Sequence, residues 1–398
     1  MKIYEIGTGY TPIPAQMGAA TEIVVEELTK AFLKQGVPVE IVDIATEHRA
    51  PTTLPIREVK VPNMFSGTDV QLGLMHKLKR VVYSIALAGE LRKILMQVNE
   101  KVVLHFHNQY NLFFFLKLIP RKLRQKCTIA YTNHSGIWRL PWEEIKSIIQ
   151  KRYFQEAECM KKADVVFVLN QETKQNVMQH LGVPEMRLVV INNGVNTDVY
   201  RPLSEEEKKA AREKWGLKDR RVILQVGSVY ENKGQLRSAE YLLPLLKENA
   251  DLVFAYAGGI VDESYQQKIQ KFAKKYALEE QIRYLGVIVP GKELNELYNT
   301  AVATILPSRY ESFGMVVIES FAAGVPVLVD KKGLIHLGEG SVAYNNMYVP
   351  NVVKESILGN EEKYKQFCLS ARSNAEDVYG WNKVASAYLS VLGDIINV

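Results

Sequence analysis

Two carboxylates on either side of a glycine are the residues of this chain best spaced to bind a polar ligand. Glu311 and Glu319 have seven residues between them, and Gly314 lies in that interval. If a helix begins near Gly314, Glu319 lies about one and a half turns inside it and faces the same side as the preceding loop. The glycine allows a ligand to approach the backbone, and the first amides of a helix favour phosphate or sugar oxygens. An isolated pair of this kind is more commonly two solvated surface acids.

The segments around this loop predict the elements that position it. Residues 302–306 are apolar and end at a proline, which indicates a buried strand. Residues 315–323 predict a helix that ends at a glycine, and residues 325–329 predict the next buried strand. A strand, a helix and a parallel strand form one crossover unit, and ligands of such sheets bind at the carboxyl ends of the strands. We therefore expect a binding site in the loop 308–314.

A second loop of the same kind carries a cation. Residues 221–226 predict a strand, and the glycine-containing loop 227–234 follows it and leads into another predicted helix. Lys233 lies near the end of this loop. By residue type alone, a lysine in such a loop is an ordinary solvated cation.

Histidines follow two strands predicted in the first half of the chain. The apolar segment 102–106 runs into His105-Phe106-His107, and residues 128–132 are followed by Asn133-His134. A lone histidine after a strand is usually structural. Residue type therefore favours a structural role for His107 and His134, and a place in a polar site is the alternative.

Length and composition indicate a two-domain globular protein. The 398 residues exceed one ordinary core, and 47% of them are hydrophobic and 24% charged. No apolar run is long enough to span a bilayer, and the N-terminus lacks a secretory layout, so we expect a cytoplasmic protein. The three cysteines are scattered without metal-ligand spacing.

The excess positive charge lies in the first half. Residues 1–200 hold 25 Lys and Arg against 19 Asp and Glu, whereas the remaining residues hold 25 of each. A predicted helix at 76–97 combines apolar residues at helical spacing with five cations, and residues 121–126 add a second cluster; the five are Lys77, Lys79, Arg80, Arg92 and Lys93. The pattern fits an ordinary surface helix, and it also fits a contact with an anionic membrane. No nucleic acid partner is expected, because no basic stretch is interleaved with stacking aromatics.

The string PSRYESFGMVVIESFAAGVPV, residues 307–327, closely resembles the donor-site signature of retaining glycosyltransferases of family 4. Residues 191–198, 284–289 and 379–384 resemble further segments of the same family, so the resemblance covers nearly the whole chain. It implies an α/β protein of the GT-B fold, with two Rossmann-like doubly wound domains facing across a cleft. The acceptor-side domain would span 1–195 and the donor-binding domain 196–377, with a helix at about 378–398 packing back on the first.

The resemblance also assigns roles to individual residues. Glu319 would bind the ribose hydroxyls of the donor, Glu311 would contact the donor sugar, and Lys233 would neutralise the diphosphate. His134, which follows a strand in a Thr-x-His setting, resembles the family histidine that contacts the transferred sugar. The expected catalytic residues are His134, Glu311 and Lys233; the expected donor-binding residues are Gly18, Ser228, Lys233, Ile288, Ser312, Phe313, Gly314, Met315, Val316 and Glu319; those on the acceptor side are Tyr10, His107 and Trp138.

Two positions depart from the family pattern. Gly18 matches the first of two glycines beside the donor phosphates, but Ala19 occupies the place of the second. In the phosphate loop, Ser228 stands where the family has an arginine. This removes one cation from the diphosphate site unless Arg309 or Lys332 compensates.

The resemblance implies a hexosyltransferase that retains the anomeric configuration. It would move a sugar from a UDP- or GDP-sugar to a glycan or lipid-linked acceptor in bacterial-type surface polysaccharide synthesis, in the cytoplasm or at the inner face of the cell membrane. The donor is a co-substrate, no other cofactor is expected, and no metal is expected because the sequence contains no Asp-x-Asp motif. Two alternatives remain open. One is a nucleotide-sugar epimerase of the same fold, and the other is a non-catalytic nucleotide-sugar-binding partner subunit, which the departures at Ala19 and Ser228 favour.

Overall fold

A computed structural model describes residues 1–15, 20–62, 64, 74–309, 311–330, 340–344 and 349–396. The chain divides into two compact units: Met1–Gly194 together with Trp381–Val398, here called unit 1, and Val195–Gly380, called unit 2. The domain boundary predicted from the sequence lies one residue from this division, and the predicted start of the last helix lies three residues from it. The acceptor and donor roles of the two units stay predictions.

Unit 1 is built on a seven-stranded parallel sheet in the order β3-β2-β1-β4-β5-β6-β7. The strands are β1 Ile3–Ile6, β2 Val39–Ile44, β3 Ile56–Val59, β4 Val102–Phe106, β5 Cys127–Thr132, β6 Val165–Val168 and β7 Leu188–Val190. Helices cover both faces of such a sheet, so its inner strands are near-continuous apolar runs. The edge strand β3 has no counterpart among the strands predicted from the sequence. This strand is short and mostly half-exposed at the sheet edge, so its sequence lacks a buried pattern.

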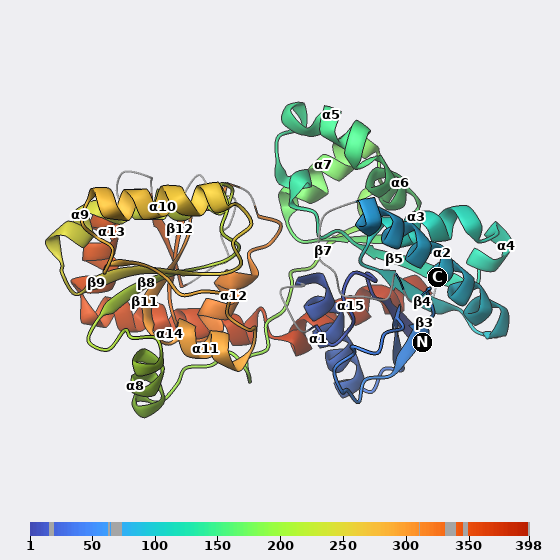
Figure 1. The fold of residues 1–398 in the computed structure, drawn as a ribbon. Helices are drawn as coiled ribbons and strands as arrows, with labels where there is room; N and C mark the ends of the chain where they lie inside the picture. The colour runs from blue at the N-terminus through green and yellow to red at the C-terminus, as the bar shows by residue number, and fades with distance from the viewer. Residues whose placement is uncertain are drawn as a thin grey trace. The chain divides into compact units, whose positions relative to one another are not determined.

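Two helices from opposite ends of the chain share one face of the unit 1 sheet. They are α1 Ala20–Lys34 and α15 Trp381–Ile396, which build a common core with Ile3, Val103 and Phe167 of the sheet (Figure 1). The other face carries α2 Leu74–Gln97, α3 Gln109–Leu118, α5 Trp142–Arg152, α6 Phe154–Lys162 and α7 Gln171–Leu181, with the short α4 Arg121–Arg124 beside α2. The last helix of the chain therefore belongs to the core of the first unit.

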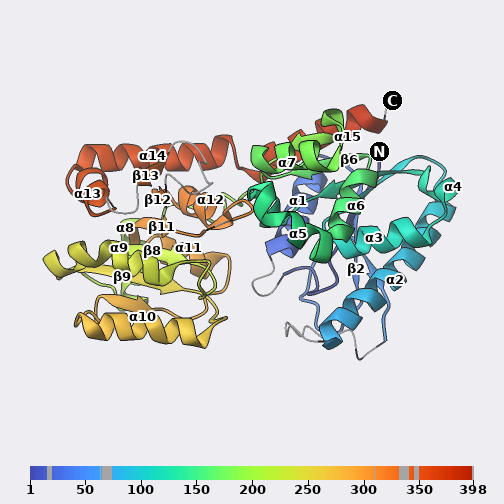
Figure 2. The same cartoon turned by 90° about the horizontal axis from the view of Figure 1, so that it is seen from above.

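Unit 2 has a six-stranded parallel sheet in the order β10-β9-β8-β11-β12-β13. The strands are β8 Arg221–Val226, β9 Leu252–Ala257, β10 Ile282–Tyr284, β11 Ala301–Leu306, β12 Val327–Asp330 and β13 Ser341–Tyr344. Helices α9 Gln235–Glu248 and α10 Glu263–Lys275 pack on one face (Figure 2). The remaining helices are α8 Glu205–Lys214, α11 Lys292–Tyr298, α12 Met315–Ala322, α13 Val349–Val353 and α14 Glu361–Asp377. The two Rossmann-like sheets confirm the predicted fold class.

The strand order reverses once in each sheet, between β1 and β4 in unit 1 and between β8 and β11 in unit 2. At such a switch point the connections leave toward opposite faces, and the carboxyl ends of the two strands form the usual ligand site. The loops 227–234 and 308–314 follow β8 and β11, while His107 follows β4. Among the described residues, no helix has both the length and the apolar character needed to cross a membrane.

Candidate functional site

The loops 227–234 and 308–314 lie against each other at the switch point of unit 2. The backbone amide of Arg309 donates to the carbonyl of Asn232 at 3.0 Å, and the guanidinium of Arg237 donates to the carbonyl of Pro307 at 3.0 Å. Gly258, which follows β9, supports the first loop so closely that a Cβ there would lie 2.2 Å from the carbonyl oxygen of Gly227. The two loops are therefore held together before any ligand binds.

Buried amide side chains fix the shape of the first loop from below. The amide of Gln225 donates to the carbonyl of Lys233 at 2.7 Å, and the amide of Gln235 donates to the carbonyl of Ser228 at 3.0 Å. The hydroxyl of Ser238 donates in turn to Gln225 at 2.7 Å. Because these amides are buried, their bonds to the loop are costly to break, and the loop is preorganised.

The ammonium of Lys233 forms an ion pair with the Glu311 carboxylate across the two loops. The hydroxyl of Ser308 donates to the same carboxylate at 2.7 Å. The side chains of Lys233 and Glu311 are 22% and 13% exposed, so a ligand can reach both. The structure thus brings together two residues that the sequence predicted to be catalytic, and each neutralises the other.

Gly314 begins α12 in the left-handed conformation, with φ 93° and ψ 58°. This conformation costs other residues roughly 1–2 kcal/mol, so the turn favours glycine. The N-cap residue is a glycine and makes no side-chain capping bond, so among the described residues the first amides, at Met315 and Val316, are available on the loop side. The ring of Phe313 is buried against the ring of Tyr379, 5.9 Å away between centroids, so only its backbone is suited to a ligand. Ser312 is half-buried in the same loop.

Glu319 lies just over one turn into α12 and is held by two tyrosines. The hydroxyl of Tyr298 donates to its Oε2 at 2.8 Å, and the hydroxyl of Tyr200 makes a second hydrogen bond. Burial raises the pKa of Glu319 to about 7, although both tyrosine hydrogen bonds oppose the shift. The carboxyl group therefore changes its charge close to neutral pH.

The other predicted donor-binding residues are distributed over neighbouring segments. Ser228 is exposed in the first loop, and Arg309 pairs at 3.2 Å with Glu231, three residues further along that loop. Ile288 is half-buried in the segment 285–291 that follows β10. Gly18, and the suggested compensating residue Lys332, lie outside the described residues.

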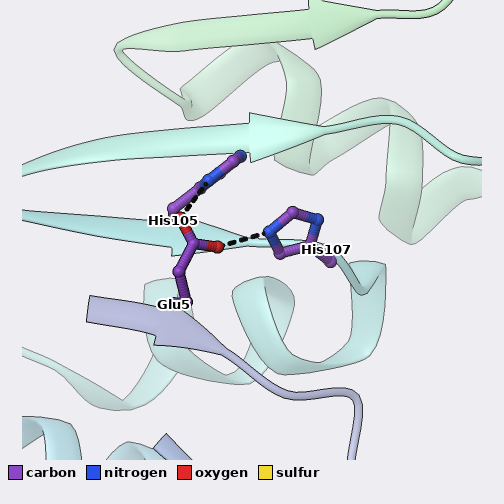
Figure 3. A group of neighbouring side chains, drawn as sticks. All are labelled: Glu5, His105 and His107. Atoms are coloured by element: carbon purple, nitrogen blue, oxygen red, sulfur yellow. Dashed lines mark hydrogen bonds and ion pairs between the residues drawn. The ribbon is translucent and has the colours of Figure 1, made fainter. Parts of the chain in front are cut away.

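In unit 1, Glu5 of β1 bonds His105 and His107 (Figure 3). Glu5 lies opposite His105 in the parallel pairing of β1 with β4. Its two carboxylate oxygens lie 2.9 Å from Nδ1 of His105 and 2.7 Å from Nε2 of His107. The remaining ring nitrogen of His107, Nδ1, lies 3.0 Å from Nε2 of His134. The structure therefore brings His107 and His134 together at the carboxyl end of the sheet.

The charges in this group follow from burial and pairing. Burial alone would raise the pKa of Glu5, but the neighbouring His105 and His107 lower it to about 2. Burial lowers the pKa of His107 to about 4 and holds that of His134 well below its usual value. At neutral pH Glu5 is a carboxylate, and His107 and His134 are neutral.

Among the described residues, one group of at least three potential metal ligands occurs, formed by Glu5, His105 and His107 with their ligand atoms within 4.8 Å of one another. Both imidazoles lie at hydrogen-bonding distance from the carboxylate, each on its own oxygen. A carboxylate shared by two N–H donors accounts for this geometry. The expectation that the reaction needs no metal stays a prediction.

Tyr10 and Trp138, the other acceptor-side candidates, differ in their surroundings. Tyr10 is half-buried, its hydroxyl accepts from Asn108 at 2.8 Å, and the Arg80 guanidinium lies 4.6 Å from its ring centroid. Trp138 is fully buried, and its indole nitrogen donates to Glu156 at 2.6 Å. The prediction that Trp138 contacts an acceptor is wrong, because the indole has no exposed surface and its one donor is bonded inside the core.

Four polar residues of these sites were missed from the sequence: Glu5, His105, Tyr200 and Tyr298. The sequence did offer signals for Glu5 and His105. Glu5 is an acid within an apolar strand, and His105 and His107 are two residues apart, a spacing that places both side chains on one face of a sheet. No spacing links Tyr200 or Tyr298 to Glu319, so the sequence offered no signal for them.

Two family models match successive parts of the chain. The model described as Glycosyltransferase Family 4 matches residues 21–199, and the model described as Glycosyl transferases group 1 matches residues 207–336. Between them they cover most of unit 1 and much of unit 2.

Known proteins with similar sequence or structure agree with these matches. An uncharacterized glycosyltransferase of Methanocaldococcus jannaschii is 26% identical over 339 residues, which are 78% of this chain and 80% of that protein. Sucrose-phosphate synthase from Thermosynechococcus elongatus has a TM-score of 0.74 at 18% identity, covering 100% of this chain and 99% of that one. Anabaena HepE in complex with UDP and glucose has a TM-score of 0.71 at 14% identity, covering 98% and 99%. At these identities the two structures show a common fold.

Proposed function

Because this chain belongs to the family 4 glycosyltransferases and has the GT-B fold, we propose that it moves a sugar from a nucleoside diphosphate sugar to an acceptor hydroxyl with retained configuration. Unit 2 binds the donor and unit 1 the acceptor. The observation that carries the proposal is the joining of Lys233, Glu311 and the uncapped start of α12 at the switch point of unit 2. The solved complex of HepE with UDP and glucose supports a nucleotide sugar as the donor.

The donor site works by an exchange of partners. The diphosphate takes the place of Glu311 beside the Lys233 ammonium, and Glu311 is released to accept hydrogen bonds from hydroxyls of the donor sugar. Without a ligand, the ion pair keeps both charges compensated. The first amides of α12 add donors for phosphate or sugar oxygens, since a helix start carries partial positive charge.

The chemistry is electrostatic. The bond between the anomeric carbon and the diphosphate oxygen breaks, and a bond from that carbon to the acceptor oxygen forms on the same face of the sugar. Negative charge grows on the departing diphosphate, where Lys233 and the helix amides stabilise it without reorganising. The acceptor hydroxyl transfers its proton to the departing diphosphate. We expect activity to persist in a chelator.

Glu319 accepts hydrogen bonds from the ribose hydroxyls of the donor. Tyr298 and Tyr200 hold its carboxyl group in one orientation, so the ribose meets an acceptor that is already placed. The ionised form is the stronger acceptor. Donor binding therefore responds to the charge of Glu319.

The acceptor is proposed to be a lipid-linked or membrane-proximal glycan of a surface polysaccharide. Helix α2 exposes an apolar stripe of Met75, Leu78, Val81 and Ile85, each between 36% and 54% exposed. Its cations are fewer than expected at the surface, because Lys79 is buried and donates to the Tyr10 carbonyl at 3.2 Å. Apolar contact should therefore contribute more to membrane binding, and salt should weaken it less, than the charge pattern alone predicted.

Donor turnover across UDP- and GDP-sugars tests the proposal. In the presence of EDTA, we expect one donor to be hydrolysed slowly without an acceptor, and to be consumed rapidly by sugar transfer when its acceptor is supplied. An epimerised nucleotide sugar as the product would support the epimerase alternative. Donor binding without hydrolysis or transfer, with every plausible acceptor supplied, would support the partner-subunit alternative.

A further inference from the structure

The polar group of unit 1 extends beyond the three residues of Figure 3 into one continuous chain of hydrogen bonds. On one side of Glu5, the chain begins at the Tyr388 hydroxyl of the last helix, which lies 3.3 Å from the Thr132 hydroxyl. Thr132 lies 2.7 Å from Nε2 of His105, and Nδ1 of His105 lies 2.9 Å from Glu5. On the other side, Glu5 lies 2.7 Å from Nε2 of His107, and Nδ1 of His107 lies 3.0 Å from Nε2 of His134. Every member is at most 4% exposed except His134, which is half-buried. His134 is therefore the member of the chain that a ligand can reach.

The contacts restrict where the protons lie. A carboxylate only accepts hydrogen bonds, so His107 must donate to Glu5 from Nε2. The contact between Nδ1 of His107 and Nε2 of His134 holds only one proton, because two N–H groups would point at each other. Either His107 is neutral and accepts from His134, or His107 is charged and donates to it.

Burial decides between the two arrangements. His107 is almost completely buried, and a charged imidazole there would lie beside a second imidazole, His105, with ring centroids 4.2 Å apart. Burial and this neighbour lower the pKa of His107 to about 4, although Glu5 opposes the shift. His107 is therefore neutral with a bare Nδ1, and His134 donates to it from Nε2. A neutral ring carries one N–H, so Nδ1 of His134 is left as an acceptor.

We propose that Glu5 and His107 are positioning residues that fix His134 as the Nε2–H tautomer, so that its Nδ1 accepts a hydrogen bond from a hydroxyl of the sugar substrate. The inference rests on the proposed function and specifies the partner of His134 by its chemistry. A bare imidazole nitrogen accepts from a hydroxyl and gives no hydrogen bond to a phosphate or a carboxylate. In the reversed arrangement Nδ1 of His134 would be a donor, which a phosphate or a carboxylate can accept from.

The tautomers can be measured directly in the full chain. Long-range proton–nitrogen correlation spectra of the nitrogen-15-labelled protein distinguish a bare ring nitrogen from a protonated one, and His107→Gln and His134→Gln assign the signals. We expect a protonated Nε2 and a bare Nδ1 at both His107 and His134. A proton on Nδ1 of His134 would overturn the proposal, whether or not any variant folds or any donor is turned over.

Glu5→Gln tests the role of the carboxylate, because an amide of the same size also donates hydrogen bonds. We expect the His134 signals to become those of mixed tautomers and kcat to fall about tenfold, the effect of one neutral hydrogen bond, with the donor KM unchanged. Glu5→Asp keeps the charge, so it should restore part of the single-tautomer His134 signals and part of kcat. Asp43→Asn is the matched control, since Asp43 is also a buried carboxylate of unit 1 but bonds the Arg49 guanidinium and the amide of Ile13.

Donor analogues that each lack one hydroxyl identify the partner of His134. With the unaltered protein, kcat/KM for one analogue should be about tenfold lower than for the complete donor. With His134→Ala, kcat/KM for that analogue and for the complete donor should differ little, because the hydrogen-bond partner is already missing. His134 signals that do not change in a folded Glu5→Gln protein would contradict the proposal. So would a metal ion retained by the purified protein through Glu5, His105 and His107. Correct tautomers in a protein that turns over no donor would confirm the positioning of His134 by Glu5 and His107, and would contradict the proposed function and with it the sugar as the partner of His134.

Discussion

Lys233 and Glu311 show how a charged binding site can be stable without its ligand. Each group is only partly buried, and each neutralises the other. In the mechanism that we propose, a diphosphate and a sugar replace this pairing. The sequence predicted both residues but not their contact, because 78 positions separate them along the chain and loop conformation decides the pairing. Arg309 pairs with Glu231 of the same loop, and we propose it as the cation that offsets the serine at position 228.

Lys233→Ala should lower kcat on the order of a hundredfold, as removal of one preorganised charge at a departing anion often does. The Glu311 carboxylate also loses its partner, so donor binding should weaken. Steady-state kinetics with the best donor measure both effects. Lys354→Ala, which removes a surface lysine paired with Glu248, is the control and should change neither. Normal turnover by a folded Lys233→Ala protein would show that the diphosphate does not bind at this loop.

Ser228→Arg should strengthen donor binding, because it restores a second cation in the phosphate loop. Isothermal calorimetry with the donor nucleotide measures the change. Arg309→Ala in the unaltered chain should weaken binding if Arg309 compensates for the serine. Unchanged or weaker affinity of a folded Ser228→Arg protein would show that Ser228 does not face the diphosphate.

The charge of Glu319 should make donor binding depend on pH. Its pKa is raised to about 7, so the ionised fraction grows between pH 6 and pH 8, and donor affinity should rise over that interval. The free energy of unfolding of the ligand-free protein should change with pH in the opposite direction. Its contribution from the neutral Glu319 is fully present below the ordinary pKa of a glutamate and is lost as pH rises through about 7. Glu319→Gln should bind the donor more weakly and abolish both pH dependences. Calorimetry and thermal unfolding across this range measure them, and a donor affinity that falls with pH would contradict the assignment.

Helix α2 has a buried side and an exposed apolar side. One side of the helix buries Tyr83, Leu87 and Leu91 in the core, while the opposite side exposes Leu78 and Ile85. The sequence pattern predicted the helix and its basic character. It could not show that Lys79 turns inward, because a long cationic side chain can reach a buried carbonyl from a position that looks exposed on a helical wheel.

Replacing Leu78 and Ile85 of α2 by serine should weaken binding to anionic vesicles. Removing two exposed apolar side chains reduces the area that enters the lipid interface, at about 25 cal/mol per Å². Sedimentation with anionic and neutral vesicles, each at low and high salt, measures the loss. Leu369→Ser is the control, since Leu369 is 72% exposed on α14 of the other unit. Equal and negligible sedimentation of the unaltered protein with both kinds of vesicle would contradict membrane binding and indicate an acceptor that is not membrane-bound.

At the scale of the whole molecule, the sequence predicted most of the architecture because buried parallel strands and amphipathic helices have distinct periodicities. The strands after which the loops 227–234 and 308–314 begin were located to within a residue. The network of Glu5 and His105 was not predicted, since it depends on which strands become neighbours. Tyr388 joins that network from α15, after the chain has passed through the entire second unit.

The stereochemistry of the first turnover tests the central claim most directly. The donor that supports hydrolysis is mixed with the protein, an acceptor and EDTA, and proton NMR follows the anomeric signal of the product before it equilibrates. A retaining glycosyltransferase with an α-linked donor should give an α-linked product and one equivalent of free nucleoside diphosphate, and Lys233→Ala should slow both together. A β-linked product, an epimerised nucleotide sugar, or turnover that requires an added metal ion would contradict the account.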